Sequence, residues 1–274
     1  LGTGTRLGSV TASALAGIDR SEPFDVTPYA HAFFEHFLRN PICQDMGRKI
    51  KIAFSSSAKD DALTFTHDIG FIPVLHNGTR GFKMLVGGGI GAQPRIADVI
   101  QEFISVEEFI PFTEAVVRVF DQYGERNRRN KARMKFLIKE QGFEAFQNRV
   151  LEVYKAISPK KIDIAPAEIS IKNIADFDAN NAVDTHFSSW KANNVFAQKQ
   201  DGFVAVGIAI DRGDISSDKA RALAEVIDAF CGDDLRFTIG QSILLRGIKE
   251  ANLPALYQAL QQLDLSKSGF HKIN

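Results

Sequence analysis

The chain has 274 residues, of which 45% are hydrophobic and 24% charged, and its formal net charge at pH 7 is zero. These proportions are ordinary for one or two folded domains, and the balanced charge provides no overall field to attract nucleic acid or an anionic membrane. No apolar run is long enough to cross a bilayer. We therefore expect a cytoplasmic protein with neither nucleic acid nor a membrane as its partner.

The chain contains only two cysteines, Cys43 and Cys231, far apart in the sequence. Their scarcity indicates a reducing compartment and argues against a disulfide-stabilised fold. It also excludes an iron–sulfur cluster held by four thiolates of this chain alone. The six histidines show no metal-ligand spacing, so no metal ligand is expected within the chain.

The first half of the chain mixes strand and helix patterns. Alternation predicts a strand over 48–55, with Ile50 and Ile52 on one face and Lys49 and Lys51 on the other. Two more strands are expected over 70–75 and 81–86. Helical spacing predicts helices over 29–39, 94–103, 106–123, 127–140 and 143–156.

The second half follows a polar stretch and predicts a compact unit of its own. Strands are expected over 203–210, 235–239 and 242–248, a helix beginning at Ser216 or Ser217 and ending at Phe230, and a helix over 253–263. The order β-α-β-β-α is that of a ferredoxin-like half-domain.

Lys49 and Lys51 are the most informative local feature. On a strand their Cα atoms lie roughly 6.5–7 Å apart on one face, and two neighbouring ammonium groups favour an anion between them. A solvated sheet face is the more common meaning of an arbitrary Lys-x-Lys. The basic stretch that follows Gly124 has the same two interpretations, because Arg126, Arg129 and Arg133 would share a helical face that binds carboxylates or only water.

A run of glycines, Gly87 to Gly89, follows the strand over 81–86 and would let a ligand approach the backbone closely. With Ala92 it loosely fits a dinucleotide-binding fingerprint. The next helix is expected only at Pro94, and no convincing acidic partner for a ribose follows. A nicotinamide-binding domain is therefore a minor alternative. No Lys-Ser/Thr pair follows these glycines, which excludes a P-loop.

Several longer segments together make the chain resemble the nitrite/sulfite reductase family. In the family's order they are 10–13 with 15–19, 39–41 leading to 48–51, 82–89, 126–136, 190–198, and 236–238 with Gln241. The resemblance implies an α+β fold. It places a larger α/β siroheme-type domain over 1–158, a linker over 159–185, and a ferredoxin-like half-domain over 186–274. The family's second α/β domain, which would supply four cysteines to a 4Fe–4S cluster, is missing from this chain.

The resemblance also implies a function: the six-electron reduction of sulfite to sulfide or of nitrite to ammonia. The cofactors would be siroheme and a 4Fe–4S cluster whose ligands lie outside this chain, and the electron donor a ferredoxin or a flavoprotein. Lys49 and Lys51 would bind the oxyanion and help to supply protons. Siroheme contacts would come from Arg6, Gly8, Arg48, Gly87, Gly88, Gly89, Arg126, Arg129, Arg133, Lys135 and Gln241. The chain alone is expected to be inactive.

Two departures from the family's pattern bear on activity. A gapless match places the family's active-site arginine at Gly8, with Arg6 two residues earlier, and Ser242 replaces the asparagine usually next to Gln241. A degenerate paralogue that binds a tetrapyrrole without turnover therefore remains the main alternative.

Overall fold

The computed structural model describes residues 7–91, 93–157, 164, 171–172, 174–177, 183–232 and 234–270. They form two compact units, each with a separate hydrophobic core; the second unit takes in Ile18–Arg20 together with the chain from Glu168 onward. The second unit thus starts inside the expected linker, and Phe177 stacks on Phe230 with ring centroids 4.3 Å apart. No helix in the described ranges is both long and apolar enough to span a membrane.

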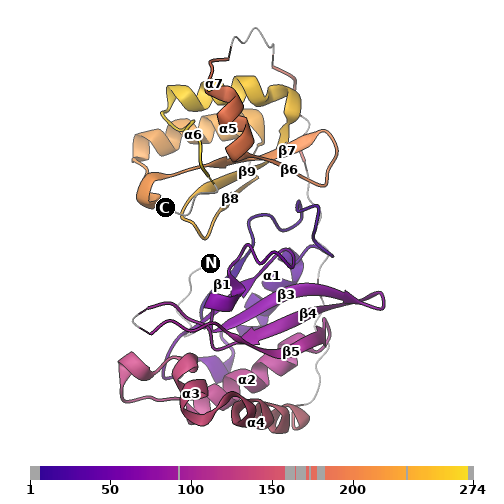
Figure 1. Cartoon of the computed structure of the whole chain (residues 1–274), viewed down its shortest axis with the longest axis vertical. Coiled ribbons are helices and arrows are strands. Elements are labelled where there is room, and N and C mark those ends of the chain that lie inside the picture. The colour runs from indigo at the N-terminus through magenta and orange to yellow at the C-terminus, as the bar shows by residue number, and fades with distance from the viewer. Residues whose placement is uncertain are drawn as a thin grey trace. The chain divides into compact units, whose positions relative to one another are not determined.

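A five-stranded sheet forms the centre of the first unit (Figure 1). Its strands, in spatial order, are β1 (Leu7–Ala12), β2 (Ile50–Phe54), β3 (Ile69–His76), β4 (Thr79–Val86) and β5 (Asp98–Ser105). The first three are parallel, whereas β4 and β5 are antiparallel to their neighbours. The starts of β1, β2, β3 and β5 therefore meet the end of β4 at one edge of the sheet, which is called the starting edge below.

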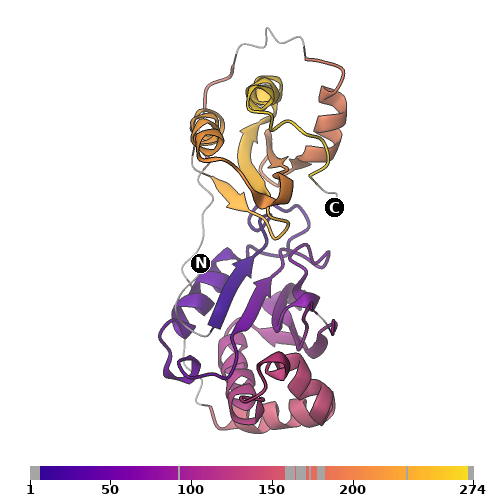
Figure 2. The same ribbon diagram turned by 90° about the vertical axis from the view of Figure 1, so that its left-hand side faces the viewer.

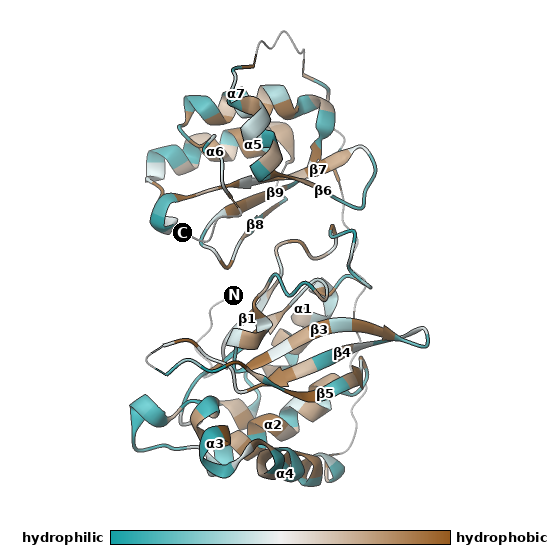
Figure 3. Cartoon of the chain, in the orientation of Figure 1, coloured by the Kyte–Doolittle hydropathy of each residue, from teal (hydrophilic) through white to brown (hydrophobic). Residues whose placement is uncertain are grey.

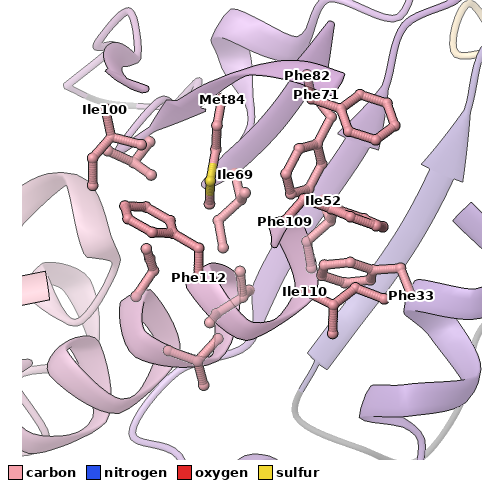
Figure 4. Packing of buried hydrophobic residues seen from close by; sticks show 14 of the residues in the cluster. Phe33, Ile52, Ile69, Phe71, Phe82, Met84, Ile100, Phe109, Ile110 and Phe112 are labelled. Carbon is pink, nitrogen blue, oxygen red and sulfur yellow. The ribbon is translucent and has the colours of Figure 1, made fainter. Parts of the chain in front are cut away.

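One face of this sheet is covered by α1 (Thr27–Phe37) and α2 (Phe109–Tyr123), whose buried aromatic residues meet those of the strands. Figure 4 shows Phe33 and Phe109 from the helices beside Phe71 and Phe82 from the strands. The rings of Phe82 and Phe109 lie 5.0 Å apart between centroids. Aromatic pairs at this distance add roughly 0.5–1.5 kcal/mol beyond the burial of their area.

Two further helices, α3 (Met134–Gln141) and α4 (Phe143–Lys155), complete the first unit, and α4 packs against α2 through Phe112 and Tyr154. Figure 3 shows hydrophobic residues concentrated in β3, β4 and β5, whereas α3 and α4 carry many hydrophilic residues. Short 3-10 turns occur at η1 (Pro41–Cys43), η2 (Thr64–Thr66) and η3 (Arg129–Lys131).

Two of the expected helices in the first unit are wrong. Residues 98–105 form strand β5 instead of a helix. The pattern was ambiguous because Ile100 and Ile104, which are buried and four residues apart, share a face in a helix and in a strand alike. The basic helix over 127–140 is α-helical only from Met134 onward. Residues 125–133 contain Ala132 as their one apolar residue, so this stretch has no face to bury against the core.

The second unit has a four-stranded antiparallel sheet in the order β6-β7-β9-β8, with α6 and α7 packed on one side of it (Figure 2). Its elements are α5 (Phe187–Asn194), β6 (Val195–Ala197), β7 (Phe203–Ile208), η4 (Asp211–Gly213), α6 (Ser217–Phe230), β8 (Leu235–Phe237), β9 (Ile243–Lys249), η5 (Glu250–Asn252) and α7 (Leu253–Gln262). The expected β-α-β-β-α order is confirmed from β7 to α7, and Ser216 caps α6 by accepting from the Lys219 amide. Neither α5 nor β6 was expected from the sequence.

Candidate functional site

The two lysines lie at the start of β2, where the expected alternation is confirmed. Ile50 and Ile52 are fully buried in the core, whereas Lys49 and Lys51 are exposed. Because Ile50 and Ile52 pack with α1 and α2, Lys51 lies on the sheet face opposite to those helices. Neither lysine forms an ion pair with any residue in the described ranges. Both ammonium groups are therefore available to a ligand.

A buried carboxylate joins Lys51 to the rest of the starting edge. Asp68, which is 1% exposed, accepts a hydrogen bond of 2.9 Å from the Lys51 amide. It also accepts two from the Arg133 guanidinium, at 3.2 and 2.9 Å. Burial raises the pKa of Asp68, and the charge of Arg133 opposes that effect. The contact with a guanidinium keeps Asp68 in its ionised form, so the pair is a buried salt bridge.

The glycine run is attached to the same carboxylate residue. The Gly87 amide donates to the Asp68 carbonyl oxygen over 2.8 Å. A Cβ atom at Gly88 would lie 2.3 Å from the carbonyl oxygen of Phe65 and 2.6 Å from that of His67, so the position excludes any side chain. Asp68 is thus hydrogen-bonded to the backbone of both Lys51 and Gly87, and their membership of one site stays a prediction.

Two further cations hold the loop that the glycines begin. Arg95 donates to the Gly87 carbonyl over 3.0 Å and pairs with Asp98. Lys135 is 4% exposed and donates to the carbonyls of Gln93, at 2.6 Å, and of Gly89, at 3.4 Å. Burial lowers the pKa of Lys135. Arg133 and Lys135 therefore bind the protein's own oxygens, and their contact with a cofactor stays a prediction.

The other expected basic residues do not form one helical face with Arg133, since the helix that would align them is not there. Arg126 binds the Asp45 carbonyl at 3.0 Å and the Asp121 carboxylate at 2.5 Å. Arg129 is exposed and makes no ion pair within the described part of the chain. Arg48 has a buried Nε that finds no hydrogen-bond partner among the described residues.

The remaining residues that the sequence predicted for the siroheme site are Gly8, Gln241 and Arg6. Gly8 lies in β1 at an irregularity between the pairs Leu7–Ile50 and Ser9–Lys51, and so beside the lysine strand. Gln241 belongs to the second unit, exposed in the turn between β8 and β9 with a φ of 59°. Arg6 lies outside the described residues.

Asp68, His67 and Arg95 were missed by the sequence reasoning. Each is a single polar residue outside the helices and strands, with no repeat or spacing to single it out. The one available signal was the position of His67 and Asp68 directly before a buried strand.

Comparison with known proteins matches this arrangement to a single family. Residues 3–157 match the family described as "Nitrite and sulphite reductase 4Fe-4S domain", and residues 196–263 match "Nitrite/Sulfite reductase ferredoxin-like half domain". The first match covers more than half of the chain, and the two domains occur in the order found here. The chain belongs to the nitrite/sulfite reductase family.

Individual relatives agree with this assignment. The chain is 30% identical over 254 residues to "Sulfite reductase [ferredoxin] 1" of Mycolicibacterium paratuberculosis, covering 92% of this chain and 42% of that protein. It is 27% identical over 255 residues to "Ferredoxin--nitrite reductase" of Synechococcus elongatus, covering 90% and 46%. The structure of Mycobacterium tuberculosis NirA superimposes with a TM-score of 0.75 at 29% identity, covering 96% of this chain and 45% of that one. The chain thus spans less than half the length of each.

The residues present fit one of the family's two cofactors. Siroheme carries many carboxylates, and the orphaned Arg48 Nε beside the unpaired Lys49 and Lys51 provides a matching set of donors. A 4Fe–4S cluster does not fit, because the chain has two cysteines and both are buried. Burial raises the pKa of the Cys43 thiol to about 12, which keeps it protonated and unsuited to binding iron.

Proposed function

We propose that this chain forms the oxyanion-binding wall of a siroheme-dependent reductase that reduces sulfite to sulfide or nitrite to ammonia. The single observation that carries the proposal is the pair Lys49 and Lys51, which are exposed and unpaired within the described ranges. By contrast, Arg95, Arg133 and Lys135 bind oxygens of the protein itself. Siroheme, when bound, supplies the metal centre at which such an oxyanion is reduced. Electrons would come from a ferredoxin, which the relatives' names mention, or from a flavoprotein.

The proposed work of the chain's own residues follows from their charges. Lys49 and Lys51 hold a small oxyanion by charged hydrogen bonds and stabilise the negative charge that grows as electrons arrive. Their ammonium protons can move to an oxygen of the anion as it leaves as water. The Asp68–Arg133 salt bridge positions the backbone of Lys51 on one side and Gly87 on the other. Glycines at 87–89 keep side chains away from a flat macrocycle beside the lysines.

The fold argues against a nicotinamide-binding domain. A dinucleotide fingerprint needs a strand, a glycine turn and a helix that begins at the turn. Here the loop after Gly89 returns through Arg95 to strand β5, with backbone hydrogen bonds between Gly89 and Arg95 in both directions. A reducing compartment such as the cytoplasm is part of the proposal, supported by two cysteines that form no disulfide.

Substitution of the lysines in the complete reductase tests the proposal. Lys49→Gln and Lys51→Gln each remove one charged hydrogen bond, worth about 1.5–3 kcal/mol. Each should weaken nitrite and sulfite binding by roughly ten- to a hundredfold. Lys59→Gln is the matched control, since Lys59 is another exposed lysine of the same unit. Steady-state turnover with reduced ferredoxin and difference spectra on anion addition give the two measurements.

Three outcomes of this experiment differ in meaning. Unchanged anion affinity in both lysine variants would contradict the assignment of the site. A wild-type protein that has siroheme absorbance but no turnover would identify a degenerate paralogue. Loss of binding in the Lys59 variant to the same extent would show that general charge, and not this site, attracts the anion.

A further inference from the structure

His67 lies between η2 and β3, at the starting edge and next to the lysine strand. The register of the parallel strands pairs Ile52 with Ile69, and the Lys51 amide binds Asp68, so His67 comes beside the beginning of β2. Its carbonyl oxygen lies under Gly88 on the other side. The backbone of His67 thus lies between β2 and Gly88, and its imidazole is half-buried.

The hydrogen bonds of His67 fix which ring nitrogen is free. Nδ1 lies 3.0 Å from the Leu63 carbonyl oxygen, which can only accept, so the proton of the neutral ring is on Nδ1. The Thr66 hydroxyl lies 3.4 Å from the same nitrogen and 2.9 Å from the same carbonyl. Nε2 is therefore the atom that would gain a proton.

Charged residues on β2, before η2 and before β3 all act on the pKa of His67. Lys51 on β2 disfavours a second positive charge, whereas Asp68 before β3 and Asp60 before η2 favour it. Desolvation by burial outweighs them all and lowers the pKa of His67 below its ordinary 6.5. Asp68 is itself neutralised by Arg133. The ring is consequently neutral at pH 7 as long as Lys51 has no counterion.

We propose that His67 takes up one proton at Nε2 when a small oxyanion binds at Lys51, so that the imidazolium becomes a further cation of the oxyanion site. The inference rests on the proposed function, because that function places the anion at Lys51. A bound anion cancels the repulsion from Lys51 and adds an attraction of its own. By linkage, proton uptake and anion binding strengthen each other equally.

Such a group serves the reaction directly. Removal of an oxygen from the anion as water consumes protons, and an imidazolium releases its proton near neutral pH far more readily than an ammonium group does. His67 then returns to the neutral form and is recharged from solvent. The proton comes from solvent and ends in the departing water, and the two electrons that the removal of each oxygen requires come from the donor of the proposed function.

The test uses the chain of 274 residues itself, with sodium nitrite as the probe. Nitrite stays a monoanion throughout the range of about pH 5 to 8 in which histidine changes its charge. Imidazole NMR signals of the six histidines are followed over this range with and without saturating nitrite. His67→Asn assigns the signal and retains a donor for the Leu63 carbonyl. Lys51→Gln removes the charge but not the amide that binds Asp68, and Lys59→Gln is its matched control.

We expect His67 to titrate below pH 6.5 in the free chain, Lys51→Gln to raise its pKa, and Lys59→Gln to leave it unchanged. Nitrite should raise the pKa of His67 in the wild type. Nitrite affinity should increase toward low pH, approaching tenfold per pH unit because one proton is taken up. In His67→Asn this slope should vanish, which a merely structural histidine would not cause.

Two failures are distinguishable. Nitrite that shifts the side-chain signals of Lys51 but leaves the pKa of His67 unmoved overturns the role of His67 and leaves the oxyanion site intact. Nitrite that shifts neither Lys49 nor Lys51 shows that the oxyanion site itself is wrong, and the proposal for His67 falls with it.

Discussion

At the scale of single residues, Asp68 determines how the starting edge is built. Its carboxylate accepts from the Lys51 amide and from two nitrogens of Arg133, while its carbonyl accepts from the Gly87 amide. One residue therefore joins β2, the end of β4 and the segment before α3. Because the pair with Arg133 is buried, removal of either partner leaves a charge with neither water nor a counterion.

Arg133→Met should reveal this dependence. Loss of the guanidinium leaves Asp68 unpaired, and we expect the first unit to lose about 3–5 kcal/mol of stability. Hydrogen exchange of β2 and β3 amides is the measurement to use, because the single tryptophan, Trp190, belongs to the second unit. Arg126→Met is the control: its pair with Asp121 is 43% and 36% exposed, so a loss of at most ~1 kcal/mol is expected. Equal losses in the two variants would contradict a buried salt bridge.

The sequence predicted some of these residues and could not predict others. Lys49 and Lys51 were recognisable because strand alternation is a local pattern, with two buried isoleucines between and after them. Asp68 and His67 acquire their roles only from pairing between β2 and β3, which residues 17 positions apart in sequence do not reveal. A tertiary contact of this kind has no periodic signature.

At the scale of elements, the loop from Gly87 to Arg95 owes its shape to close backbone approach and to bound cations. Gly88 sits against two carbonyl oxygens of the η2–β3 connection, which are backbone atoms and cannot rotate away. Lys135 of α3 binds the Gln93 carbonyl, and Arg95 binds the Gly87 carbonyl from within the loop. Gly87 to Gly89 are therefore held in place by contacts within the protein itself.

Gly88→Ala should disrupt this fixed shape. The new Cβ would lie 2.3 Å from the Phe65 carbonyl oxygen, and overpacking of this kind costs about 1–3 kcal/mol. We expect faster hydrogen exchange in β3 and β4 and weaker anion binding at Lys51. Gly240→Ala is the control, because its Cβ would meet only the Thr238 hydroxyl, at 3.7 Å. An unchanged β3–β4 exchange rate in the Gly88 variant would show that the loop adjusts freely.

The prediction of helices and strands failed where the local pattern fitted a helix and a strand equally well, or where it fitted neither. Strand β5 carries buried Ile100 and Ile104, and its register with β4 shifts twice, which removes a clean alternation. Helix α5 has no apolar face to detect, although Trp190 is buried. In contrast, α2, α4, α6 and α7 have continuous apolar faces, and the expected bounds agree with the observed ones to within a few residues.

At the scale of the whole molecule, the chain combines two cores with a zero net charge, so anion binding depends on how cations are distributed and not on their number. In the first unit Arg95, Arg126 and Arg133 are each paired with a carboxylate. Lys49 and Lys51 at the starting edge are unpaired within the described ranges. A neutral protein can thus present a local positive site to a small anion.

The same whole-molecule view predicts that this chain alone holds no iron–sulfur cluster. A 4Fe–4S cluster takes four thiolates, and the sequence provides two cysteines that belong to different units. Cys43 is fully buried with a pKa of about 12, and Cys231 is 5% exposed. Within the described ranges, no group of three or more His, Cys, Asp or Glu residues is placed to hold a metal ion.

Anaerobic reconstitution of the purified chain with iron and sulfide is the measurement. We expect no stoichiometric cluster absorbance, and slow reaction of both cysteines with a thiol reagent until the chain is unfolded. The Cys43→Ser variant should behave like the wild type in the cluster assay, because a buried protonated thiol contributes no ligand. A stoichiometric cluster in the wild type that disappears in Cys43→Ser would require several chains to share one cluster, and would overturn the view that the ligands lie outside this chain.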